Sequence, residues 1–144
     1  NKNKVKTMKT YFESIANELH TPLVYAQPNL ANVLIDKISP DDLSEDGLII
    51  VITPLRSSIA VDLFGRMRRY FELGVLGLIN VDYNEEEIDT LTTKAFAMLK
   101  KVVSMAGGDM STVNIVTDVF DAMMGGVYAN VTLRPSEGVC HENE

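Results

Sequence analysis

Apolar side chains recur every three or four residues in two segments of the chain, and this period predicts two helices. In residues 5–19 the apolar positions, such as Phe12 and Leu19, fall on one face of a helix. We expect this first helix to end near His20-Thr21-Pro22, because proline disfavours the α conformation in the residue before it.

A capping signal marks the start of the second helix, which we predict over residues 85–105. Asn84 can accept hydrogen bonds from the free amides of the first turn, and Glu87 can reach back to the cap. An apolar stripe follows, and Gly107-Gly108 supply a stop signal. The acidic block Glu85-Glu86-Glu87 places negative charge at the positive end of the helix dipole, so we give these glutamates a structural role.

Two further segments have the apolar pattern of strands. Leu48-Ile49-Ile50-Val51-Ile52 is a β-branched run typical of a buried strand. Residues 57–81 follow a period of two, with Phe71 and Val75 on one face. Gly74 and Gly77 inside this long segment predict a bulge, a bend or a division into two strands. A helix over residues 59–78 is the alternative, although it must tolerate three glycines.

The last part of the chain predicts an antiparallel hairpin of two strands, residues 113–117 and residues 127–133. In the second strand, every other residue from Val127 onward is expected to point inward. Two short apolar runs, Leu23-Val24-Tyr25 and Val33-Leu34-Ile35, lie between prolines nearer the start of the chain. Either of these runs could be an extended segment.

The order of the elements, with strands in runs rather than in strict βαβ alternation, favours an α+β fold. We expect a mostly antiparallel sheet of about four strands with two main helices packed on one face. Residues 5–134 would form a single α+β domain, because 144 residues are about one domain's worth of chain. Residues 135–144 contain only Val139 and Cys140 as apolar residues, and we expect a flexible C-terminal tail there.

Composition and charge exclude several classes of protein. Hydrophobic residues make up 46% of the chain and charged residues only 23%, which excludes intrinsic disorder of the whole chain. The net charge of −7 repels a phosphate backbone, so we expect no sequence-specific binding of nucleic acid. Continuous apolar runs such as Val75-Leu76-Gly77-Leu78-Ile79 are far below the ~18–20 residues of a membrane span, and the sequence predicts no secretory signal.

Residues with catalytic or metal-binding chemistry are few and scattered. His20 and His141 belong to no H-E-x-x-H or H-x-x-E-H motif, and Cys140, the single cysteine, is expected to be a free thiol. The acidic pairs Asp41-x₃-Glu45 and Asp118-x₂-Asp121 fit no EF-hand pattern, so we interpret them as solvated acidic loops. We therefore predict no catalytic residue, no bound cofactor and no metal.

A cluster of arginines with one tyrosine is the candidate functional surface of the chain. Its residues are Arg66, Arg68, Arg69 and Tyr70. Arginine and tyrosine are enriched at protein interfaces, which makes this cluster a candidate oligomer interface. The alternative is a solvated strand edge whose charges prevent unwanted pairing between strands.

The pattern as a whole resembles the small tail-completion or tail-terminator proteins of tailed bacteriophages, particularly those of phages and prophages of gut Bacteroidota. The resemblance covers residues 5–134 and rests on the order of five elements. The first three are the N-terminal amphipathic helix ending at Leu19, the strand ending at Thr53-Pro54 and the long strand through Tyr70-Phe71-Glu72-Leu73-Gly74-Val75. The last two are the capped helix opening at Tyr83-Asn84-Glu85 and the final strand from Gly126-Val127. It implies an α+β protein without enzymatic activity. Such proteins assemble as homo-oligomeric rings that cap the tail tube or join it to the head.

The resemblance and the missing catalytic motifs together predict a non-enzymatic structural or assembly protein of the virion. Its partners would be further copies of itself and other virion proteins, without a membrane, and it would be assembled in the host cytoplasm. The alternative is a bacterial cytoplasmic module of α+β type that binds a protein partner or a small ligand. A third interpretation is an enzyme whose site is built from scattered carboxylates or shared with a neighbouring subunit.

Overall fold

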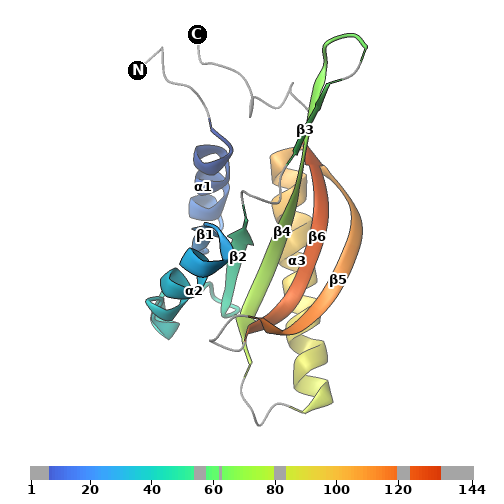
Figure 1. Ribbon diagram of the computed structural model, residues 1–144. Coiled ribbons are helices and arrows are strands. Elements are labelled where there is room, and N and C mark those ends of the chain that lie inside the picture. Colours follow the sequence, from blue (N-terminus) through green and yellow to red (C-terminus); the bar gives the residue numbers. More distant parts are fainter. Residues whose placement is uncertain (1–6, 54–57, 62, 80–83, 120–123, 134–144) are drawn as a thin grey trace.

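The computed structural model describes most of the chain, and its helices and strands make an α+β fold (Figure 1). The described residues are 7–53, 58–61, 63–79, 84–119 and 124–133. In them, the helices are α1 (Met8–Glu18), α2 (Pro28–Asp36) and α3 (Glu85–Ala106), with a short 3-10 helix, η1 (Pro40–Asp42). The strands are β1 (Leu23–Tyr25), β2 (Leu48–Ile52), β3 (Ser58–Val61), β4 (Met67–Leu78), β5 (Asp109–Val119) and β6 (Met124–Leu133).

All six strands join one sheet in the order β1-β2-β4-β6-β5, and β3 pairs with β4 outside this path. β1 runs parallel to β2, and every other pair is antiparallel. The predicted α+β class and the mostly antiparallel sheet are therefore confirmed. The expected numbers are too small, because the described residues form six strands and three α-helices rather than about four strands and two helices.

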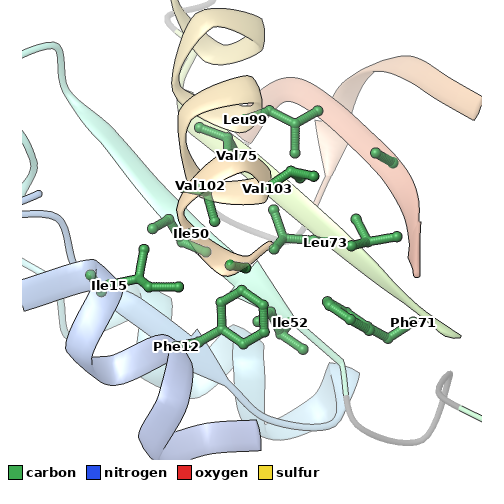
Figure 2. Close-up of a cluster of buried hydrophobic side chains, with 14 of the residues drawn as sticks. Phe12, Ile15, Ile50, Ile52, Phe71, Leu73, Val75, Leu99, Val102 and Val103 are labelled. Carbon is green, nitrogen blue, oxygen red and sulfur yellow. The ribbon is translucent and has the colours of Figure 1, made fainter. Parts of the chain in front are cut away.

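The main core lies between the sheet and the helices α1 and α3. Alternate residues of the central strands point into it, among them Phe71, Leu73 and Val75 of β4, all of which are buried. Figure 2 shows Phe12 of α1 beside Phe71, and the two rings meet edge to face with their centroids 5.5 Å apart. Phe71 and Val75 thus share one face of β4 as the period-two pattern predicts, and the predicted inward face of β6 from Val127 onward is confirmed.

A second, smaller core lies on the opposite face of the sheet, under α2. Ala31 and Ile35, which are one helical turn apart, pack there together with Ile49 of β2. The two predicted helices, α1 and α3, share one face of the sheet as expected, and α2 is a third helix, on the other face, that was not expected. The run Val33-Leu34-Ile35 is helical because Pro28 at the start of α2 pre-sets the backbone angle and the buried residues follow a helical period.

Local capping signals explain where the two predicted helices begin and where α3 ends. Thr7 caps α1, and its hydroxyl accepts a hydrogen bond from the amide of Thr10 at 3.1 Å. The side-chain oxygen of Asn84 accepts a hydrogen bond from the amide of Glu87 at 2.9 Å, as the capping signal predicts. Gly107 ends α3 in the left-handed conformation, with φ of 71°.

The long segment predicted over residues 57–81 is divided into two strands, but the division lies at Gly65. This glycine lies in the turn between β3 and β4 with φ of 77°, a value that glycine adopts readily. Gly74 lies inside the unbroken strand β4 for a different reason. A Cβ atom there would come within 2.6 Å of the ring of Tyr128, so glycine makes room for that ring.

Gly126 of β6 leaves no room for a side chain, and this leads to a stability prediction. Its φ is 153°, and a Cβ atom would collide with the carbonyl oxygen of Val75. We expect Gly126→Ala to lower the free energy of unfolding by about 2–4 kcal/mol, because backbone must move to admit the methyl group. Urea unfolding of the purified variant measures this loss.

Gly47 provides the matched control for that substitution. Its φ of 76° is also positive, but no atom lies within 4 Å of the position that a Cβ would take. We expect Gly47→Ala to cost only the conformational strain of about 1–2 kcal/mol. Equal losses in the two variants would contradict the steric explanation for Gly126.

Candidate assembly surface

A two-stranded arm projects from one end of the sheet. It consists of β3, the turn Leu63–Arg66 and the first four residues of β4, which pair with β3 from Met67 to Tyr70. β6 accompanies β4 only as far as Arg69, so the outer part of the arm is a ribbon of two strands. Figure 1 shows this ribbon extending beyond the ends of α1 and α3.

The arm carries four exposed large apolar side chains. Leu63 and Phe64 at its tip are 100% and 82% exposed, and Ile59 and Val61 of β3 are 55% and 62% exposed. The guanidinium carbon of Arg66 lies 5.3 Å from the centroid of the Phe64 ring, a cation–π distance. Contiguous exposed apolar side chains that are bordered by polar residues mark interaction sites on soluble proteins.

The alternation of side chains gives the arm one mainly apolar face. Ile59 lies opposite Arg69, and Val61 lies opposite Met67. These four residues are on the same side of the sheet as Phe71, which belongs to the main core. The apolar stripe of β4 therefore continues out of the core onto the arm, past the helices that cover it elsewhere.

The predicted arginine cluster lies on the arm, but the alternation divides it. Arg68 and Tyr70 point to one face, and both are exposed. Arg69 points to the other face, where it is half-buried, its Nε atom is buried, and its charge acts on Tyr25 of β1. Arg66 is exposed in the turn. Arg69 thus belongs in part to the packing of its own chain, whereas the other three residues face outward.

Sequence reasoning missed the apolar residues of the arm. The signal that could have found them is Leu63-Phe64-Gly65, because two large apolar residues precede a glycine where turns normally carry polar side chains. The same glycine divides the long period-two pattern into two strands. An apolar turn between two strands would have directed attention to the tip of the arm.

The surface also has two hollows that could hold a small molecule. One of about 410 Å³ lies at the base of the arm, and its lining includes Ser58, Tyr70, Ser111, Asn130 and Thr132. The other, of about 330 Å³, lies at the start of α3, and its lining includes Asp46, Glu86, Glu87 and Lys94. The first hollow offers mainly uncharged hydrogen-bonding groups, and the second offers mainly carboxylates.

Two of the other candidate residues from the sequence, His20 and Asp41, lie at the end of a helix and in a short 3-10 helix. His20 follows the end of α1 with φ of 50°. Asp41 lies in η1, and its amide donates a hydrogen bond to Oγ of Ser39 at 3.3 Å. Within the part of the chain that the structure describes, no three His, Cys, Asp or Glu side chains gather as metal ligands. Asp121, Cys140, His141 and the expected tail of residues 135–144 lie outside the described residues.

Comparisons with protein-family models, with curated proteins and with solved structures find no match to this chain. Among the described helices, none combines the length and the apolar character needed to cross a membrane. The geometry of the arm is therefore the main observation that bears on function.

Tyr25 provides a test of the inward position of Arg69. Burial raises the pKa of Tyr25 above its ordinary value of 10.0, and the charge of Arg69 acts in the opposite direction. We expect Arg69→Met to raise this pKa further, because the stabilising charge for the tyrosinate is lost. The titration of Tyr25 alone is obtained by subtracting the tyrosinate absorbance of a chain that also carries Tyr25→Phe. If Arg69→Met leaves the pKa of Tyr25 unchanged, the charge of Arg69 does not act on Tyr25.

The same residue predicts how stability depends on alkaline pH. Because the pKa of Tyr25 is raised in the folded chain, its contribution to stability is fully present below the unfolded pKa of about 10. That contribution is lost as the pH rises through the folded pKa. Between the unfolded pKa and the folded pKa, we expect the free energy of unfolding to fall more steeply in the unsubstituted chain than in Tyr25→Phe, as measured by urea unfolding at a series of pH values.

Proposed function

We propose that this chain is a non-enzymatic assembly protein, a tail-completion subunit of a bacteriophage or prophage that forms a homo-oligomeric ring through its arm. The subunit would end the tail tube or join the tail to the head, and its partners would be further copies and other virion proteins. The observation that carries the proposal is the projecting arm with its exposed apolar side chains. The phage assignment comes from the resemblance in the order of elements.

The arm is an element that gains stability from a partner. A hairpin of two strands is at best marginally stable in water, and a third strand or packing against another element is needed for more. The outer part of the arm pairs only β3 with β4. Burying one exposed Val, Leu, Ile or Phe side chain contributes about 1.5–3 kcal/mol. A partner that covers the arm would therefore stabilise it considerably.

Electrostatics favours a second copy of the chain as that partner. The chain has a net charge of −7, yet residues 58–70 contain three arginines and one aspartate. The acidic excess therefore lies on the rest of the chain, which attracts the arm of a neighbouring copy. Because the arm and the body are different surfaces, their contact is heterologous, and such a contact forms a ring when the rotation between subunits closes.

A binding module for a small ligand is the second candidate function. The hollow of about 410 Å³ at the base of the arm favours it, because that volume is within the range of ligand sites. Groups such as the Ser111 hydroxyl and the Asn130 amide could hydrogen-bond an uncharged polar molecule there. This function ranks second, because most ligand sites are lined mainly by hydrophobic side chains and this hollow is lined largely by polar ones.

The role of the arm leads to a prediction for the solution mass. We expect the unsubstituted chain to form a discrete assembly of several subunits, and the double variant Ile59→Asp/Val61→Asp to be a monomer. Two carboxylates on the apolar face of the arm would have to be buried without partners in the assembly, which is costly. Light scattering over a wide range of protein and salt concentrations measures both masses.

Ile115→Asp is the matched control, because Ile115 is 67% exposed on β5 and lies outside the arm. We expect it to keep the mass of the unsubstituted chain. Circular dichroism and urea unfolding establish that the double variant remains folded, since both substituted side chains are exposed. An unsubstituted chain that stays monomeric under all conditions, or a double variant that assembles normally, would count against the proposal.

A further inference from the structure

The outer side of α2 is a second exposed apolar surface formed by neighbouring residues. α2 buries Ala31 and Ile35 against the sheet, while Leu30 and Val33 are 53% and 48% exposed. Leu30 and Val33 are three residues apart, so they are neighbours on the helix surface. Figure 1 shows α2 on the outside of the molecule, at the end opposite the arm.

The segment that follows α2 in the chain is acidic. The exposed carboxylates of the segment are Asp41, Asp42, Glu45 and Asp46. Asp36, at the end of α2, is also exposed, and Lys37 beside it is the one opposing charge between α2 and η1. The arm has the complementary character, because its apolar face ends at a turn that carries Arg66.

On the basis of the ring-forming function proposed above, we propose that the arm of one subunit docks on the outer side of α2 of the next subunit. The apolar face of the arm, with Ile59 and Val61, would cover Leu30 and Val33. Arg66 in the turn would then lie near the acidic segment after α2. The contact would combine apolar burial with charge pairing, and the charge pairing would select the correct partner surface.

Other exposed apolar side chains fit the arm less well. Phe96 on α3 has the ammonium group of Lys100 5.0 Å from the centroid of its ring, and Lys101 is the next residue. A surface with these lysines repels the arginines of the arm. Ile115 is the single exposed large apolar side chain among the described side chains of β5, and scattered single apolar residues are ordinary on protein surfaces.

The arm cannot reach α2 of its own chain, because Figure 1 places the two elements at opposite ends of the molecule. Residues 1–6 and 135–144 offer few apolar side chains with which to cover it. Residues 1–6 contain three lysines and a single apolar residue, Val5, and residues 135–144 contain only Val139 and Cys140 as apolar residues. A second copy of the chain is the occupant that supplies both the apolar and the acidic partner.

Cross-linking between two different chains tests the contact directly. Both chains carry Cys140→Ser, one chain carries Val61→Cys, and the other carries Val33→Cys with a different affinity tag. After co-expression and treatment with a short bis-maleimide reagent, we expect a covalent heterodimer with both tags as the main product. A single chain with both new cysteines should give a ladder of covalent multimers.

Ile115→Cys replaces Val33→Cys in the control pair, and we expect much less cross-linking to it because Ile115 lies outside the docking surface. Preferential cross-linking of Val61→Cys to itself or to Ile115→Cys would overturn the docking site. If assembly is lost in Ile59→Asp/Val61→Asp but no product forms with Val33→Cys, the ring proposal stands and the α2 contact is wrong. A chain that is monomeric and gives no cross-link overturns both.

Discussion

The alternation of side chains along β4 is the constraint on which the rest of the structure depends. β4 pairs with β2, β3 and β6, so its register decides which residues of these strands share a face. Phe71 and Val75 must face α1 and α3 for the main core to close, and a slip of one residue would turn them to the other side. The same register places Ile59 and Val61 on the apolar face of the arm. The core and the arm are therefore parts of one continuous stripe.

That stripe is longer than the helices that cover it. The arginine cluster can therefore be both an oligomer interface and a charged strand edge that prevents unwanted pairing. In a free monomer the uncovered apolar residues and the open strand edge of the arm favour nonspecific pairing, which charged side chains on an edge discourage. Arg66 and Arg68 are exposed where they can do this. In an assembly the same charges attract an acidic partner surface and repel a basic one. Protection of the edge and selection of the partner thus follow from the same residues.

The sequence predicted the elements that depend on local signals. The Asn84 cap, the five-residue buried run of β2 and the alternation in β6 each identify an element from its own residues. α2 could not be identified in the same way, because a nine-residue helix over Pro28–Asp36 owes its stability to packing on the second face of the sheet. The arginine cluster indicated the arm, but the opposite orientations of Arg68 and Arg69 follow only once the strand boundary at Gly65 is known.

The connection between arm and body explains how a heterologous contact could give a ring of fixed size. β4 is one strand of 12 residues that begins in the arm and ends in the sheet. It pairs with β3 or β6 along its whole length, so its backbone hydrogen bonds leave no hinge between the two parts. A rigid arm that docks on a rigid surface repeats one rotation from subunit to subunit, and a repeated rotation is what closes a ring. In the ring proposed above, the acidic bodies would repel one another, the arm would supply the attraction, and the angle between arm and docking surface would set the number of subunits.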